Sequence, residues 1–268
     1  MSTPRPPYDV AIVGLGISSV HQLTREAEET IRRCERVFVA DHAPGAVDYL
    51  KSLNSRTTDL THQFSADVHR LTTYRDIAAE IVAAAVEKSP VCFATYGHPK
   101  MYSYPTVLIE RAASILDLKI MIVPGISFLD TLLVDLDIDP GFDGLQLYEA
   151  TDLLVRDRPL QPDVACVIAQ APVVLEPSLK GGKPGKSNLD KLQAHLLKFY
   201  PAKHEFVIVI SKTHPLANSV LQRAPLADLA TVLAKASYSG TLYIPPVAHR
   251  GIADQELADK MRGAPVAA

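Results

Sequence analysis

Two short segments, VCFATYGHP at residues 91–99 and IMIVPGIS at residues 120–127, predict the centre of the fold. Each begins with a run of four apolar residues and ends in a turn that contains Gly and Pro. This pattern is typical of a buried parallel strand that stops abruptly. A helix is predicted between them, from about Ser103 to Leu116. Because ligands bind outside the carboxyl ends of strands in open α/β sheets, we expect a ligand site at the turns 96–99 and 124–127.

Further strands and helices are predicted on both sides of this unit. Before residue 150 we expect strands at 8–13 and 36–40, and helices beginning at Thr24 and spanning 72–88 and 128–136, with a long polar loop at 55–71. After residue 150, strand-like runs at 164–169, 205–210 and 241–244 mix with longer loops, a helix at 188–200 and a frayed terminal helix within 247–268. We therefore predict two α/β lobes, 1–149 with a mostly parallel sheet and 150–268 with a mixed sheet, separated by a cleft.

The composition of the 268-residue chain is that of a soluble globular protein, with 47% hydrophobic residues, 21% charged residues and a net charge of −3. A slightly acidic chain lacks the basic field typical of nucleic-acid-binding proteins. The chain contains no run of about 18 apolar residues, so no membrane span is predicted. Its start, MSTPRPP, lacks the apolar segment of a signal peptide. Cys34, Cys92 and Cys166 are scattered, which favours buried free thiols. We expect a cytoplasmic protein with neither nucleic acid nor membrane as a partner.

The turns also raise two other possibilities. Gly14-Leu15-Gly16 follows the first strand, as in a dinucleotide-binding motif, and Asp41 follows the second strand. Ser19 replaces the third glycine and the helix is predicted to begin only near Thr24, so a tight turn is favoured over NAD binding. His98 has no second His, Cys or carboxylate at metal-ligand spacing, so no metal site is expected.

Arg70 and Tyr74 form a candidate catalytic pair, because residues four apart face the same way if the helix begins early enough. An arginine can stabilise a developing oxyanion, while a phenol whose pKa it lowers takes a proton. From the pattern alone, a solvated Arg–Tyr pair is the more common outcome. The acids Asp130, Asp135, Asp137 and Asp139, which lie in and after the predicted helix 128–136, are expected to be structural.

Four motifs, in order along the chain, resemble the tetrapyrrole-methylase-like superfamily: GLG at 14–16, YGHP at 96–99, PGIS at 124–127 and TLYIPP at 241–246. The resemblance implies an α/β methyltransferase with S-adenosylmethionine (SAM) bound in the cleft between its two lobes. Within the superfamily, the chain is most similar to the borosin peptide backbone N-methyltransferases, on DLDIDPG at 135–141, YEATD at 148–152, RDRP at 156–159 and the Arg70/Tyr74 pair. This implies a homodimer that methylates backbone amides. Because the chain ends soon after Pro246, it resembles the split type, whose precursor peptide is supplied in trans.

The resemblance also implies roles for individual residues. The positions expected to bind SAM are Leu15, Tyr96, His98, Met101, Tyr102, Ser127, Phe128, Gln170, Ala171, Ser211, Gly240 and Thr241. Arg70 and Tyr74 take the catalytic positions, with Tyr96 nearby. We hypothesise that Tyr74 removes the amide proton, and that Arg70 stabilises the resulting oxyanion and lowers the pKa of Tyr74.

Three departures from the family pattern leave alternatives open. Lys100 stands where the family usually has glycine, and Phe128 replaces a small residue after Ser127. The segment QFSA at 63–66 lacks the tyrosine that related enzymes place there, so we expect methylation to be either slower or abolished. The alternatives are a tetrapyrrole carbon methyltransferase of the same superfamily and a weakly active homologue that binds a peptide.

Overall fold

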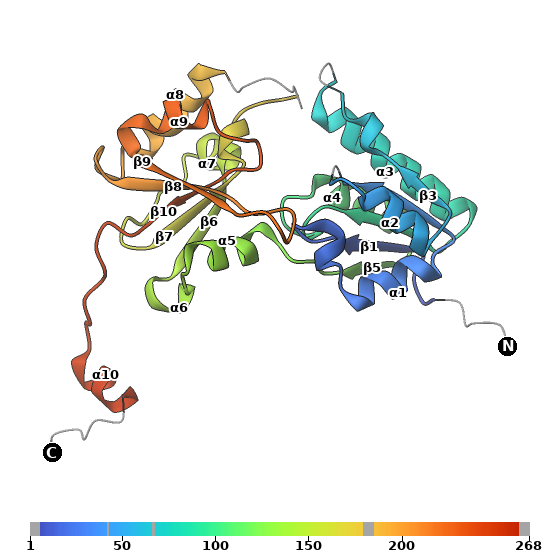
Figure 1. The fold of residues 1–268 in the computed structure, drawn as a ribbon, viewed down its shortest axis with the longest axis horizontal. Helices are drawn as coiled ribbons and strands as arrows, with labels where there is room; N and C mark the ends of the chain where they lie inside the picture. Colours follow the sequence, from blue (N-terminus) through green and yellow to red (C-terminus); the bar gives the residue numbers. More distant parts are fainter. Residues whose placement is uncertain (1–5, 42, 66–67, 179–184, 263–268) are drawn as a thin grey trace.

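The computed structural model describes residues 6–41, 43–65, 68–178 and 185–262, which form two α/β lobes side by side (Figure 1). Each lobe is built on a five-stranded sheet, with strand orders β3-β2-β4-β1-β5 and β6-β7-β10-β8-β9. The predicted fold class is therefore confirmed: the first sheet is parallel and the second is mixed. Among the described residues, no helix combines the length and apolar character needed to cross a membrane.

The first sheet places the ends of its central strands together. Its strands are β1 (Val10–Gly14), β2 (Arg36–Ala40), β3 (Thr57–Asp59), β4 (Val91–Thr95) and β5 (Ile120–Val123). Val13 lies opposite Ala94 on one side and Val123 on the other, so the three turns that follow these strands lie next to one another. Both faces are covered, one by α1 (Arg25–Arg33) and α2 (Ala46–Leu53), the other by α3 (Arg70–Glu87) and α4 (Tyr104–Ile115). Burial on both faces explains why β1 and β4 are continuous apolar runs.

The second sheet is covered in the same way. Its strands are β6 (Leu145–Glu149), β7 (Ala165–Ala169), β8 (Glu205–Ile210), β9 (Val220–Pro225) and β10 (Thr241–Ile244). One face packs on α7 (Ala150–Val155), α8 (Lys186–Leu196) and α9 (Leu229–Leu233). The other face packs on α5 (Phe128–Leu136). The short helices α6 (Pro140–Asp143) and α10 (Gln255–Met261) complete the α-helices of the described residues, with α10 projecting away from the second lobe (Figure 1).

Several boundaries differ from those that the sequence predicts. The change from one sheet to the other falls at 124–127 and not at 149/150, because β6 pairs with β7 and α5 packs on the second sheet. The predicted loop 55–71 contains β3, a 3₁₀ turn at Thr61–Gln63 and the beginning of α3. Within the described part of the predicted terminal helix, residues 247–262, only α10 is helical, since residues 247–254 are not.

Asp135 connects α5 to the segment that joins β8 and β9. Its two carboxylate oxygens accept hydrogen bonds from Ser211 Oγ at 2.5 Å and Ser219 Oγ at 2.7 Å. Its neighbours Asp130 and Asp139 cap α5 and α6, so these acids have structural roles, as predicted.

We expect Asp135→Ala to lower the free energy of unfolding by about 1–3 kcal/mol, because two partly buried hydroxyls lose their acceptor. Urea denaturation followed by circular dichroism would measure the change. Asp76→Ala, at an exposed position of α3, is the matched control. Equal midpoints for the two variants would contradict the prediction.

Candidate active site

The three turns at the carboxyl edge of the first sheet meet at Gly14, Gly97 and Gly125, which we call the glycine contact. A Cβ atom on Gly14 would lie 2.5 Å from the carbonyl oxygen of Gly97 and 2.7 Å from the nitrogen of Gly125. Gly97 also has a φ of +68°, and its backbone exchanges two hydrogen bonds with Gly16, at 3.0 and 3.2 Å. The close approach of these backbones therefore requires glycine, and the turns expected to form a ligand site do lie together.

Four of the residues expected to bind SAM line one small cavity between the lobes, which we call the Tyr96 cavity. Tyr96 follows β4, Phe128 begins α5, and Ser211 and Thr241 come from the second sheet. The cavity has a volume of only about 20 Å³, because aromatic and aliphatic side chains fill it. The other residues that line it are Ile17, Leu132, Val209 and Ser239.

Asp41, which has one carboxylate oxygen without a hydrogen-bond partner among the described residues, lies beside Tyr96. Ala40 pairs with Thr95 in register, which places Asp41 next to Tyr96 at the edge of the sheet. Asp41 is only 3% exposed; its Oδ1 accepts a hydrogen bond from the nitrogen of Ala43, and its buried Oδ2 has no partner among the described residues. Burial and the Asp41 charge together raise the pKa of Tyr96 to about 12.

Arg70 and Tyr74 line a second cavity of about 290 Å³, which we call the Tyr74 cavity. Tyr102 and Gln170, both expected to bind SAM, also line it, one from each lobe. These two residues have φ values of +57° and +58°. Left-handed backbone at non-glycine residues is strained and clusters at functional sites. The remaining lining residues are Leu71, Pro99, Lys100, Ser103, Tyr104, Val107 and Glu149.

The catalytic pair lies on the first turns of α3. The helix begins at Arg70, two residues earlier than predicted, because the His69 side chain accepts a hydrogen bond from the nitrogen of Leu71. Arg70 and Tyr74 are therefore four apart within one helix. Burial raises the pKa of Tyr74 and outweighs the Arg70 charge, which acts in the opposite direction. The expectation that Arg70 depresses the pKa of Tyr74 is thus wrong for the net shift, and the phenol is neutral at pH 7.

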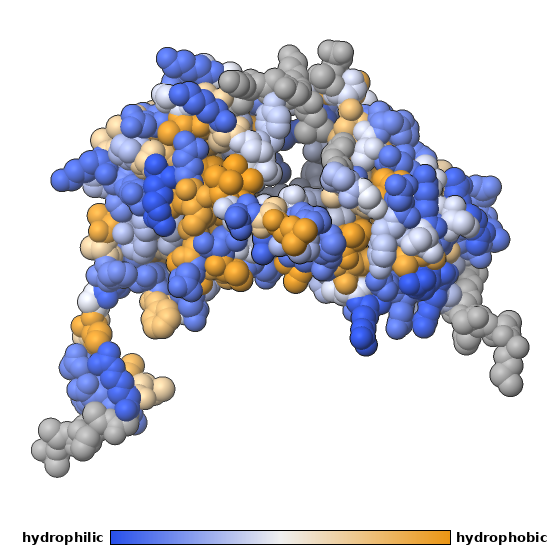
Figure 2. All heavy atoms as spheres, viewed as in Figure 1, coloured by the Kyte–Doolittle hydropathy of each residue, from blue (hydrophilic) through white to orange (hydrophobic). Residues whose placement is uncertain are grey.

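The two cavities adjoin where the lobes meet. Tyr102, in the Tyr74 cavity, and Phe128, in the Tyr96 cavity, place their ring centroids 5.9 Å apart. The lobes also bond to each other directly: the nitrogen of Arg70 donates to the carbonyl of Pro177 at 3.0 Å, and Ser18 Oγ donates to the carbonyl of Lys212 at 3.1 Å. Figure 2 shows an opening between the two lobes.

Other residues expected to bind SAM line neither cavity: Leu15, His98, Met101, Ser127, Ala171 and Gly240. Leu15 and Ala171 are fully buried in the cores of their lobes. Ser127 forms a capping box with Asp130, in which its hydroxyl donates to the carboxylate at 2.6 Å. Contacts from these side chains to a cofactor stay predictions.

The structure shows the surroundings of the three departures from the family pattern. Lys100 pairs with Glu110 on α4 at 2.5 Å, so its charge is balanced within the first lobe. Phe128 narrows the Tyr96 cavity. Phe64 packs edge-on against Tyr74, with centroids 6.5 Å apart, in the segment where related enzymes carry a tyrosine. Residue 66 of that segment lies outside the described residues.

Tyr104 and Glu149 line the Tyr74 cavity but were not predicted as site residues. Tyr104 begins α4, and its ring lies 6.2 Å from that of Tyr74. Glu149 belongs to the YEATD segment, for which the family resemblance implies no site residue. A signal was present for Tyr104, which follows a turn at the edge where ligands bind. Glu149 is the last residue of β6, which the sequence does not mark as a strand.

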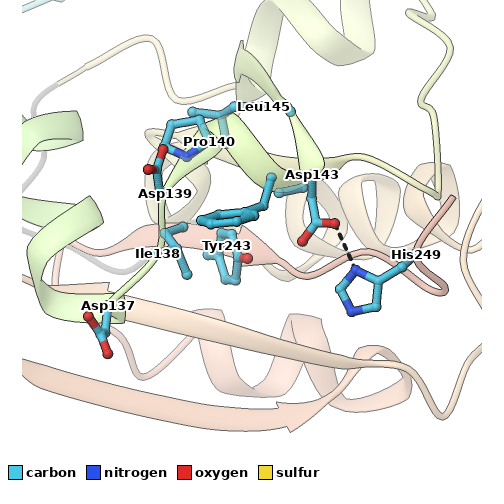
Figure 3. Close-up of a pocket in the computed structure, with 11 residues that line it drawn as sticks. Asp137, Ile138, Asp139, Pro140, Asp143, Leu145, Tyr243 and His249 are labelled. Atoms are coloured by element: carbon cyan, nitrogen blue, oxygen red, sulfur yellow. Dashed lines mark hydrogen bonds and ion pairs between the residues drawn. The ribbon is translucent and has the colours of Figure 1, made fainter. Parts of the chain in front are cut away.

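A larger cavity, of about 690 Å³, lies elsewhere, on the second lobe beside α6 (Figure 3). Two of its carboxylates already have partners: Asp139 caps α6, and Asp143 pairs with Nδ1 of His249 at 2.7 Å. Among the described residues, no group of His, Cys, Asp and Glu could hold a metal ion. None of the residues expected to bind SAM or to be catalytic lines this cavity. The Tyr96 and Tyr74 cavities therefore form the better candidate site.

Comparisons with known proteins agree with this fold. Residues 9–230 match the family model described as Tetrapyrrole (Corrin/Porphyrin) Methylases. The chain is 28% identical over 251 residues to the methyltransferase/ribosomally synthesized cyclic peptide omphalotin A precursor of Omphalotus olearius, covering 93% of this chain and 60% of that protein. It is 31% identical over 245 residues to a type I borosin cyclic peptide precursor of Coprinopsis marcescibilis, covering 89% and 62%.

The chain thus spans less than two thirds of the length of these relatives, and only 28% of a type III borosin precursor of Anomoporia bombycina to which it is 29% identical. Among solved structures, a uroporphyrin-III-C-methyltransferase from Thermus thermophilus superposes with a TM-score of 0.63 at 16% identity, covering 89% of this chain and 92% of that one. A diphthine synthase superposes with a TM-score of 0.61 at 14% identity, covering 90% and 91%. At these identities the structures support the fold alone.

Proposed function

The chain belongs to the tetrapyrrole (corrin/porphyrin) methylase family, and on that premise we propose that it is a SAM-dependent methyltransferase acting on backbone amides of a peptide. The observation that carries the proposal is the Tyr74 cavity. It brings an arginine and a phenol from one helix to the junction of the lobes, next to the Tyr96 cavity. The borosin relatives support the peptide as acceptor, since their names join a methyltransferase to a peptide precursor.

The chemistry of the residues around Tyr96 fits SAM. The glycine contact leaves no room for side chains, so backbone polar groups meet there. Oδ2 of Asp41 has no partner among the described residues and, as an acceptor, is suited to a hydroxyl or ammonium group. The rings of Tyr96 and Phe128 suit a sulfonium cation, which aromatic faces attract. Because the Tyr96 cavity is small, binding requires the Tyr102 and Phe128 rings to move apart. When bound, SAM supplies an electrophilic methyl group.

The backbone amide nitrogen must be activated before it can accept a methyl group. The lone pair of an amide nitrogen is delocalised into its carbonyl, so the nitrogen is a poor nucleophile until its proton leaves. We assign proton removal to the Tyr74 oxygen, and stabilisation of the negative charge on the amide oxygen to the Arg70 guanidinium. A positioned base typically contributes about 10²–10⁴-fold to the rate, and one oxyanion donor about 10²–10³-fold.

The proposal also states how the peptide acceptor is supplied. The named borosin relatives carry a precursor within the same chain, whereas we propose that this chain acts on a precursor peptide in trans, as a homodimer in the cytoplasm. A tetrapyrrole acceptor fits less well. The Tyr74 cavity, at about 290 Å³, lies just below the range of about 300–1,000 Å³ typical of ligand pockets, and a tetrapyrrole is a broad disc of four linked rings.

The third candidate, a homologue that binds a peptide without methylating it, is favoured by Phe64, which packs against Tyr74 in the segment where related enzymes carry a tyrosine.

Co-expression of the protein with small proteins from neighbouring reading frames, followed by mass spectrometry, tests the proposal. We expect steps of 14 Da on a peptide with an apolar, Val/Ile-rich tail, and fragmentation that places each methyl on a backbone nitrogen. SAM binding with no methylated peptide would instead support another acceptor. Peptide binding with neither SAM binding nor methylation would support the binding-only homologue.

A further inference from the structure

We propose that Glu149 binds a backbone N–H of the peptide acceptor, which makes it a specificity-determining residue of the Tyr74 cavity. The inference rests on the proposed function, because it takes the peptide as the acceptor. It adds a residue for which the sequence suggested no role, and it assigns that residue a chemical partner.

One oxygen of the Glu149 carboxylate accepts a hydrogen bond, whereas the other has no partner among the described residues. Oε2 accepts a hydrogen bond from the nitrogen of Asp152 at 2.7 Å and so caps α7. Oε1 is buried and has no hydrogen-bond partner among the described residues. A buried acceptor without a partner is destabilising, and more so when it is charged, so each one calls for an explanation such as a ligand that supplies the donor.

Glu149 lies in the wall of the Tyr74 cavity, where we propose that the acceptor binds. Glu149 ends β6, an edge strand, and pairs in register with Ala169, so that it lies beside Gln170. Both Glu149 and Gln170 line the Tyr74 cavity opposite the first-lobe residues Arg70 and Tyr74. The charge of Glu149 also acts on the phenol of Tyr102, whose pKa is raised to about 12 mainly by burial and next by this carboxylate.

The charges in the cavity indicate the kind of donor. Arg70 lines it together with Glu149, while the charge of Lys100 is balanced by Glu110, so a cationic ligand would meet the Arg70 guanidinium. A neutral N–H avoids that repulsion and still forms a charge-assisted hydrogen bond with the carboxylate. An extended peptide supplies such a donor at nearly every residue, and the residue bound at Glu149 would be fixed relative to the amide held at Arg70 and Tyr74.

Glu149→Gln is the informative variant, because its side chain keeps the same shape and its single amide oxygen can still cap α7. The NH₂ group then points into the cavity and repels an incoming N–H. Glu256→Gln, at an exposed position of α10, is the control. Since the chain contains no Trp, a peptide that carries one Trp reports binding by fluorescence without background.

The probe is a synthetic, acetylated, Val/Ile-rich peptide with one Trp, bound in the presence of S-adenosylhomocysteine so that no methyl is transferred. Its amides are replaced one at a time by esters, which removes single N–H groups. We expect one ester position to weaken binding to the unmodified protein about tenfold, and to weaken binding to Glu149→Gln less than twofold.

Equal losses in both proteins at every position would overturn the inference while leaving the proposed function intact. The scan on the unmodified protein does not depend on how the variant folds, and the absence of any sensitive position there would also overturn the inference. If the unmodified protein fails to bind the peptide at all and adds no methyl to it, the result counts against the proposed function, and the role of Glu149 falls with it.

Discussion

Tyr74→Phe is expected to lower single-turnover methylation of a bound peptide by about 10²–10⁴-fold, with little change in SAM affinity. The change removes only the phenolic oxygen, and the ring keeps its contacts with Phe64 and Tyr104. Rapid quench followed by mass spectrometry would measure the rate, and calorimetry the affinity. Tyr49→Phe is the matched control, since its hydroxyl bonds to Glu28 on the surface of the first lobe. An unchanged rate would remove Tyr74 from the mechanism.

The pH dependence of the rate follows from the same residue and distinguishes a base from a structural tyrosine. Burial raises the pKa of Tyr74 above its usual value of 10, so the phenol is protonated across the neutral range. The base form then grows about tenfold with each pH unit as long as the pH stays below that pKa. The rate should rise with pH from 7 to 9.5 in the unmodified protein, and the Tyr74→Phe variant should lose this slope. A rate that is flat with pH in both proteins would contradict a Tyr74 base.

The sequence predicts the parts of this molecule in which local pattern and tertiary structure agree. β2, β8, β10 and α5 begin and end as expected, because each is an apolar run or stripe bounded by clear turn or cap residues. The turns that meet at the glycine contact are also predictable, since Gly and Pro after two apolar strands indicate where the strands stop. The adjoining positions of the three turns follow from the parallel order of the strands.

The elements that were missed depend on partners distant in sequence. β9 is largely exposed, so no apolar run marks it, and only its pairing with β8 makes it a strand. β6 is half-buried throughout and joins the second sheet through β7, which is why the boundary between the lobes was placed too late. The raised pKa of Tyr74 could not be predicted either. The direction of the shift depends on whether burial or the Arg70 charge has the larger effect on the pKa, and only the packing of the cavity decides this.

Gly125→Ala is expected to weaken SAM binding by about 10- to 100-fold and to lower the free energy of unfolding by about 1–3 kcal/mol. The added Cβ would lie 2.5 Å from the carbonyl oxygen of Gly97 and 2.8 Å from the backbone of Gly14. Neither neighbour can rotate away, because both are backbone atoms at the ends of buried strands. The three turns must therefore separate, which displaces the backbone groups that we propose for the cofactor.

Gly251→Ala is the matched control for this prediction, since a Cβ there meets nothing within 4 Å. Isothermal titration with SAM and thermal unfolding of both variants would separate the two effects. A loss of stability in Gly125→Ala without a loss of SAM affinity would mean that the glycine contact only closes the first lobe. In that case the cofactor would depend on the second-lobe residues of the Tyr96 cavity, Ser211 and Thr241, instead of on the turns of the parallel sheet.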